Sequence, residues 1–291
     1  MKKLFRYLPY GLLSCISVYS APLRIGYLFP AIEYNSEASL RWIANQMETR
    51  YASRSFFFQG QDIDQGSSAA APTVITNIND LDSLDVMVVY VRRVWLTASQ
   101  QTRFQQFFNS GKGMVGIRSA CYAIQSWDLG RGIDSVVWGG AYNMHTDSMS
   151  YTLRMTAAAS THPIFQGVGA WTGLASLYRQ NYNGRTVASD ANILMNGNTA
   201  TEQYPVTWTR VRNGGNVFFT STGTQGEFQD PNFQKMIINA VLWAGKALPA
   251  TPVMGKRHSG RKIRIKTVGV FPSSGEEIGE LPNANGRSLD Y

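Results

Sequence analysis

The chain has 291 residues, of which 44% are hydrophobic and 16% are charged, and its formal net charge is +8. A chain of this length and composition can bury a large core, which excludes a fibrous or wholly disordered protein. Its two cysteines are too few for a disulfide-stapled scaffold or for a zinc module built from several cysteines.

Residues 1–21 have the pattern of an export signal. They begin with three positively charged residues, Lys2, Lys3 and Arg6. A mostly apolar stretch over 12–19 follows, and Ser20 precedes Ala21 at a small-residue cleavage position. The stretch is shorter than the ~20 residues of a transmembrane helix. We therefore expect an exported protein, periplasmic or secreted, without a transmembrane span. Cys15 lies in a sequence that resembles a lipoprotein box, so a lipid anchor at Cys15 is the alternative.

The remaining charge is concentrated at the C-terminus. Residues 250–291 contain seven Lys or Arg and four Asp or Glu, whereas residues 22–249 contain 17 positive and 15 negative side chains. Most of the basic residues of this tail form one run: Lys256, Arg257, Arg261, Lys262, Arg264 and Lys266. Such a run is typical of a solvated tail or of contact with an anionic surface, here the cell envelope. We expect no nucleic-acid partner for an exported protein.

The body, residues 22–249, alternates strand and helix signals. Short apolar runs predict buried strands over 23–29, 85–91 and 114–117. Apolar residues at helical spacing predict helices after Asn35, after Thr97 and from Pro231, and Thr97 with Gln100 has the spacing of a capping box. Further strands are predicted over 151–155, 193–195, 206–209 and 217–221. Strand, helix and strand with short joins indicate a parallel crossover, so we expect one three-layer α/β domain with a largely parallel central sheet.

Ligands of such sheets usually bind beyond the carboxyl ends of the strands. The most informative turn there is the segment 116–122, called the elbow below, in which small residues permit a sharp bend around Arg118. Arginine stays protonated, so Arg118 cannot be a nucleophile or general base, but it can hold a carboxylate, a phosphate or a sugar hydroxyl. Cys121 is expected to be a buried residue, and a cysteine-dependent hydrolase or amidase is the weaker alternative.

Several stretches together resemble the ThuA-like (trehalose-utilisation) family, whose fold is that of class I glutamine amidotransferases. They are 111–118, 138–145, 161–168, 204–208, 217–223, 228–233 and 239–244. The resemblance covers about residues 23–248 and implies a flavodoxin-like domain with a pocket lined by the elbow and by two further segments. One contains Gly139, Gly140 and His145, and the other contains Gly223 and Thr224. The chain departs from the family pattern at three positions. Arg118, as in one branch of the family, stands where many members have histidine, Tyr122 stands where that branch has a histidine, and Thr224 stands where the family has histidine. His145 is therefore the one pocket histidine that the resemblance carries over.

These observations predict a site with two groups of residues. His145 is expected to act as acid or base, with Glu227 or Asp128 assisting. Ligand binding is expected from eight residues: Arg118, Ser119, Trp138, Gly139, Gly140, Tyr178, Trp208 and Thr224. Among these, Trp138 or Tyr178 would stack on a sugar ring. No His, Cys and Asp cluster has metal-ligand spacing, so we expect neither a metal nor another cofactor.

The leading hypothesis is an exported ThuA-like protein that acts on or binds a carbohydrate or polyol, with hydrolysis of a sugar derivative as one form of that activity. The alternative is a catalytically lapsed binding or scaffolding module at the cell envelope. The missing pocket histidines and the basic tail favour the alternative.

Overall fold

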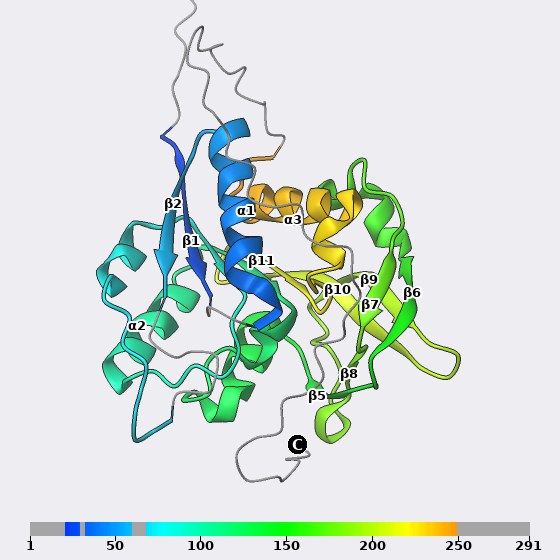
Figure 1. Ribbon diagram of the computed structural model, residues 1–291, viewed down its shortest axis with the longest axis horizontal. Coiled ribbons are helices and arrows are strands. Elements are labelled where there is room, and N and C mark those ends of the chain that lie inside the picture. The colour runs from blue at the N-terminus through cyan, green and yellow to red at the C-terminus, as the bar shows by residue number, and fades with distance from the viewer. Residues whose placement is uncertain (1–20, 30–32, 60–67, 249–291) are drawn as a thin grey trace, which may run out of the picture.

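The computed structural model describes residues 21–29, 33–59 and 68–248. The predicted export signal at 1–21, apart from Ala21, and the predicted tail at 250–291 lie outside the described residues. In the described part, a nine-stranded sheet has the order β2-β1-β3-β4-β11-β10-β9-β6-β7 (Figure 1). Its strands are β1 (Leu23–Leu28), β2 (Ser53–Phe58), β3 (Val86–Val89), β4 (Gly113–Ile117), β6 (Met149–Met155), β7 (Thr172–Ala175), β9 (Asn192–Asn198), β10 (Gln203–Arg212) and β11 (Gly215–Thr220). A separate antiparallel pair consists of β5 (Tyr142–His145) and β8 (Tyr178–Gln180).

The predicted α/β fold is confirmed, and the sheet divides into two halves. From β2 to β11 neighbouring strands are parallel, whereas from β11 to β7 they are antiparallel. The parallel half contains the continuous apolar runs, such as the fully buried β3 and β4. In β6 buried and exposed residues alternate over much of the strand, which is typical of a sheet with one solvated face.

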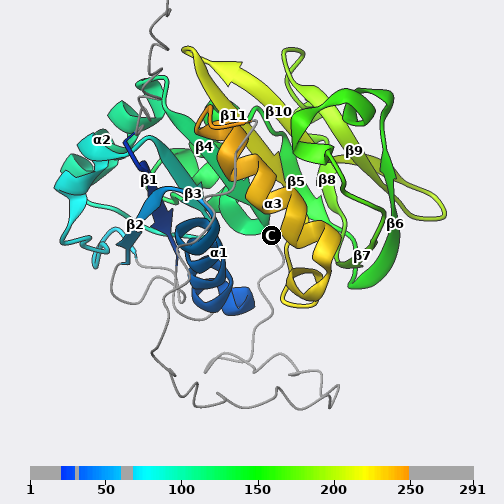
Figure 2. The same cartoon turned by 90° about the horizontal axis from the view of Figure 1, so that it is seen from above.

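Helices cover both faces of the parallel half and form the two outer layers of the three-layer fold. The main helices are α1 (Ser36–Arg50), α2 (Ala98–Asn109) and α3 (Pro231–Ala244). Figure 2 shows α1 and α3 next to each other on one face. Their apolar residues share one core with Ile25 and Val88, whereas the phenylalanines of α2 pack in a second core with Met87 and Val89. Because adjacent residues of a strand point to opposite faces, each buried strand contributes to both cores.

The helix ends confirm the predicted signals in part. Thr97 Oγ1 accepts a hydrogen bond from the N–H of Gln100 (3.3 Å), but the Gln100 side chain bonds the backbone of Ile75 instead of completing the capping box. Asp230 caps α3 by accepting the N–H groups of the second and third helical residues, at 2.7 and 3.4 Å. Asn35 occupies the N-cap position of α1, but its φ of 54° is left-handed and its side chain makes no capping bond.

No helix in the described part of the chain has the length and apolar character needed to cross a membrane. The segments β2, β5, β7 and β8 were not predicted as strands. They are short or lie at sheet edges, where the apolar pattern is weak.

Candidate functional site

The elbow begins directly where β4 ends in the middle of the sheet. Arg118 has a φ of 46°, in the left-handed region that side chains other than glycine rarely adopt, and it starts a short 3-10 helix, η4 (Arg118–Tyr122). Gly223, in the loop after β11, closes against this turn, since a Cβ at that position would lie 2.5 Å from Ile117 Cγ2. A strained residue held in this way is typical of functional sites.

The guanidinium of Arg118 is buried between two aromatic rings. Only 1% of the residue is exposed, and its Cζ lies 4.8 Å from the ring centroid of Tyr34 and 4.9 Å from that of Tyr178. Its Nη1 donates to the carbonyl of Ser221 (3.0 Å), and its Nη2 donates to the hydroxyl of Ser176 (3.3 Å). Cation–π contacts of this kind stabilise a cation that has been removed from water.

The carboxylate of Glu227 lies in η10 (Glu227–Gln229), beside the elbow. Its Oε2 accepts the N–H of Gly223 (2.6 Å) and both the N–H (2.9 Å) and the hydroxyl (3.2 Å) of Thr224, and its Oε1 accepts the N–H of Leu174 (3.3 Å). Burial raises the pKa of Glu227, while these hydrogen bonds and the charge of Arg118 oppose the rise. A carboxylate has about four acceptor positions. With four donors already in place, Glu227 holds the loop and has little capacity to transfer a proton.

Buried polar atoms around Arg118 lack partners in the described part of the protein. They are Arg118 Nε, Ser119 Oγ, Ser221 Oγ and Tyr151 OH. Leaving a buried polar group unpaired costs about 1–3 kcal/mol, so such groups are usually satisfied by a ligand or an ordered water. The elbow is therefore a candidate binding site, because several of its buried polar groups have no hydrogen-bond partner in the described part of the protein.

Two of the predicted catalytic residues lie outside the cluster around Arg118, although the imidazole of His145 is 6.3 Å from the ring of Tyr178, measured between centroids. His145 is exposed at the end of β5, and its Nδ1–H donates to the carbonyl of the adjacent Thr146 (2.8 Å). Asp128 is exposed in η5 (Asp128–Gly130). Within the described residues, no hydrogen bond joins either side chain to Arg118 or Glu227. In the part of the chain that the structure describes, no hydrogen bond links the side chains of His145, Glu227 and Asp128 to one another.

The two predicted tryptophans are core residues rather than ligand-stacking ones. Trp138 and Trp208 are fully buried against Phe219. The Nε1–H of Trp208 donates to the carbonyl of Trp138 (2.7 Å), and the Nε1–H of Trp138 donates to the carbonyl of Ala120 in the elbow (2.8 Å). Stacking on a sugar needs an exposed ring face, so these indoles support the elbow from the interior.

Gly139 and Gly140 lie close to side chains of the protein. A Cβ on Gly140 would lie 2.1 Å from Oδ1 of Asp134, a residue of the π-helical segment η6 (Ile133–Trp138) that the sequence did not single out. Asp134 is 4% exposed, and its Oδ2 accepts the N–H of Tyr142 (2.9 Å). Burial raises the pKa of this carboxyl to about 7.

The structure thus brings together Arg118, Ser119, Tyr178, Thr224 and Glu227. Tyr34 and Ser176 also contact Arg118, and no local sequence motif marks either residue. Cys121 is buried in η4. No group of three His, Cys, Asp or Glu side chains that could hold a metal ion occurs in the described ranges.

The strand order β2-β1-β3-β4-β11 of the parallel half is that of a flavodoxin-like α/β protein. The profile of the ThuA family, described as trehalose utilisation, matches residues 41–244, and the chain belongs to this family. Membership relates the protein to trehalose utilisation. No curated protein sequence matches the chain.

Solved structures with this fold include two ThuA-like proteins. The one from Parabacteroides merdae ATCC 43184 has 16% identity and a TM-score of 0.57, over 78% of this chain and 91% of that chain. The one from Bacteroides uniformis ATCC 8492 has 14% identity and a TM-score of 0.56, over 82% and 95%. A cold-adapted β-galactosidase from Rahnella sp. R3 is similar at 10% identity and a TM-score of 0.50, over 78% of this chain and 32% of the enzyme. At these identities the likeness shows the fold alone.

Proposed function

We propose that this protein is an exported ThuA-family protein, periplasmic or secreted, that binds a neutral carbohydrate or polyol at the elbow. The proposal depends on one observation. The guanidinium of Arg118 lies between Tyr34 and Tyr178, and its Nε has no partner in the described part of the protein.

The charges and hydroxyls around Arg118 favour a neutral, hydroxyl-rich ligand. The Glu227 carboxylate lies close enough to Arg118 for the two charges to interact, and its negative charge opposes the binding of an anion beside Arg118. The unpartnered hydroxyls of Ser119 and Ser221 can both donate and accept hydrogen bonds. Aromatic faces beside convergent polar groups are typical of small-molecule sites.

The geometry supports binding over hydrolysis. Arg118 stays protonated, Glu227 is occupied by four donors, and His145 is exposed on β5. General acid–base catalysis needs a group that is free to exchange a proton with the reacting atoms. Of the predicted acids and bases only Glu227 lies at the elbow, and its oxygens already accept hydrogen bonds from the protein. This favours the hypothesis of a catalytically lapsed binding module over that of a sugar hydrolase.

Localisation at the envelope is part of the proposal. Its support is the basic run within residues 250–291 and the signal-like N-terminus, both read from the sequence. A chain that ends at Pro249 should lose its association with anionic vesicles while it still binds sugar. The alternative anchor, a lipid at Cys15, would show as a mass increase that Cys15→Ser abolishes.

The decisive experiment is calorimetric titration of the full chain with trehalose. Tyr34 is partly exposed, so Tyr34→Ala should fold, and we expect it to weaken binding about 10-fold through loss of its contact with Arg118. The matched control is Tyr182→Ala, which removes an equivalent contact with Arg131 (3.5 Å) outside the elbow. Equal affinity of Tyr34→Ala and the wild type, or glucose release from trehalose, would refute the proposal.

A further inference from the structure

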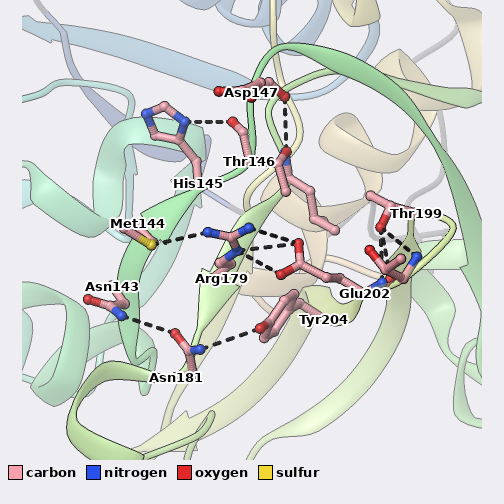
Figure 3. A network of polar contacts seen from close by, with 12 residues as sticks. Asn143, Met144, His145, Thr146, Asp147, Arg179, Asn181, Thr199, Glu202 and Tyr204 are labelled. Carbon is pink, nitrogen blue, oxygen red and sulfur yellow. Dashed lines mark hydrogen bonds and ion pairs between the residues drawn. The ribbon is translucent and has the colours of Figure 1, made fainter. Parts of the chain in front are cut away.

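A polar cleft of about 350 Å³ lies beside the outer face of β8. Successive residues of a strand point to opposite faces, so Tyr178 is buried over Arg118 while Arg179 lies in the cleft. The other polar residues that line it come from the turn after β5, from β6 and from the β9–β10 turn. They are Thr146, Asp147, Ser150, Thr199, Thr201 and Glu202. Figure 3 shows much of this network.

The cleft is held in a fixed shape by an ion pair and a capped turn. Arg179 Nε donates to both carboxylate oxygens of Glu202 (2.9 and 3.3 Å), and its Nη2 donates to Oε2 (3.2 Å). Its Nη1 contacts the sulfur of Met144 (3.1 Å). Thr199 Oγ1 accepts the N–H groups of Thr201 (3.3 Å) and Glu202 (3.0 Å) and so fixes the turn (Figure 3). A preorganised site loses little entropy when a ligand binds.

Several polar groups of this cleft have no protein partner in the described ranges. The contacts above use three of the five N–H groups of Arg179, which leaves two that can donate to a ligand. Toward the other described residues, the carboxylate oxygens of Asp147 and the hydroxyls of Ser150 and Thr201 make no hydrogen bond. The cleft therefore offers donors, acceptors and hydroxyls that can serve as either.

The charge balance indicates which ligand fits. Glu202 already neutralises Arg179, so a phosphate or carboxylate would find no unpaired cation, and it would meet the charge of Asp147. A carboxylate such as Asp147 can accept hydrogen bonds from two neighbouring hydroxyls of one molecule, while the free N–H groups of Arg179 donate to a third oxygen. The volume lies near the lower end of the range for small-molecule sites.

We propose that this polar cleft is a second binding site, specific for a neutral polyhydroxylated molecule such as a monosaccharide or sugar alcohol. It lies on the opposite face of β8 from the elbow and uses none of the residues proposed to bind there. His145 lies at its edge, next to Thr146, which is a lining residue (Figure 3). The proposal does not depend on sugar binding at the elbow.

Methionines provide local reporters for a test. Met149 lines the cleft and Met144 contacts Arg179, whereas Met47 and Met87 are fully buried in the two cores. We would record NMR spectra of the full chain labelled with ¹³C at the methionine methyl groups and titrate it with glucose and with sorbitol. The methyl signals of Met144 and Met149 should shift and saturate, with a Kd in the millimolar range, while the core signals stay in place.

Two variants test the assigned groups. Arg179→Gln and Asp147→Asn should each raise the Kd for glucose about 10-fold, because each weakens hydrogen bonds that involve a charged group. Arg103→Gln is the matched control. Arg103 lies on the distant helix α2 and also pairs with one carboxylate, that of Asp82 (2.8 Å). Unchanged core methionine signals establish that each variant is folded.

Three results would overturn the proposal. The first is the absence of a shift at Met144 and Met149 at ~50 mM glucose and sorbitol, which is well above a millimolar Kd. The second is an unchanged Kd in Arg179→Gln. The third is a stronger response to glucose 6-phosphate or glucosamine than to glucose, which would show selection by charge. Tyr34→Ala should keep the Met149 response, so that failure at the elbow and failure at the cleft are distinguished.

Discussion

Replacing Asp134 with asparagine is expected to stabilise the protein at alkaline pH and to remove a pH dependence of its unfolding. Asp134 is 4% exposed, and its Oδ1 has no partner in the described part of the chain. Burial raises the pKa of this carboxyl from 3.8 to about 7, although the N–H of Tyr142 and the charges of Arg131 and Arg185 oppose the rise. Each pKa unit corresponds to about 1.4 kcal/mol, so ionised Asp134 costs on the order of 4 kcal/mol of stability at alkaline pH.

The sign of the effect follows from the order in which the two states lose the proton. The unfolded carboxyl ionises near pH 3.8 and the folded one near pH 7. Between these values the folded state binds more protons, so the free energy of unfolding falls as pH rises and levels off above the folded pKa. The stability that the neutral Asp134 carboxyl contributes is fully present only below the pKa of the carboxyl in the unfolded state. About 2 kcal/mol of it should be lost between about pH 5.5 and pH 8.5.

Urea unfolding of the wild type and Asp134→Asn at these two pH values measures the effect. The stability advantage of Asp134→Asn should grow by about 2 kcal/mol from the lower to the higher pH. Asp82→Asn, at an exposed carboxylate, is the control and should change stability by less than about 1 kcal/mol at both. If the free energies of unfolding of wild type and Asp134→Asn differed by the same amount at both pH values, the raised pKa of the buried Asp134 carboxyl would be refuted.

Three further substitutions test the local packing. Gly140→Ala should lose more than about 2 kcal/mol in urea unfolding, because the new Cβ would lie 2.1 Å from Asp134 Oδ1, and near-wild-type stability would contradict that contact. Glu227→Gln should destabilise by about 2 kcal/mol, since an amide cannot accept all four hydrogen bonds, and an unchanged melting temperature would show that they contribute nothing. Asp230→Ala should cost about 1 kcal/mol as a lost N-cap, whereas Asp230→Asn should retain most of the stability, and equal losses in the two variants would exclude capping.

The parallel half of the sheet could be predicted because its strands are buried on both faces. Segments such as 85–91 are then continuous apolar runs, which stand out in a sequence. The edge strand β2 has the sequence SRSFFF and is only partly buried, so it shows neither a continuous run nor clean alternation. The strands β7 and β8 have four and three residues, which is too short for a periodicity.

The elbow could be predicted in outline but not in its partners. Arg118 follows a buried strand and precedes small residues, which is a pattern visible in the sequence. Ligands of parallel sheets usually bind beyond the carboxyl ends of the strands, and this rule indicates Arg118. Tyr34 and Ser176 meet Arg118 only through the tertiary fold, although the same rule applied to the end of β1 would have drawn attention to Tyr34. The prediction that Trp138 and Trp208 contact a ligand rests on their positions in or near the loops expected to form the site, and an indole at such a position can equally well fill the core, as both do here.

The strand in the middle of the sheet is also the last strand of the described chain. β11 lies between β4 and β10, and its register pairs Val217 with Met114. Until the ribosome has released residues 215–220, β4 and β10 each have an unpaired edge, and such edges are templates for aggregation. Contacts between residues so distant in sequence also slow folding. A nascent chain of this protein must therefore stay unaggregated through almost the whole synthesis of its domain, and truncation before β11 divides the sheet at its centre instead of shortening it at one end.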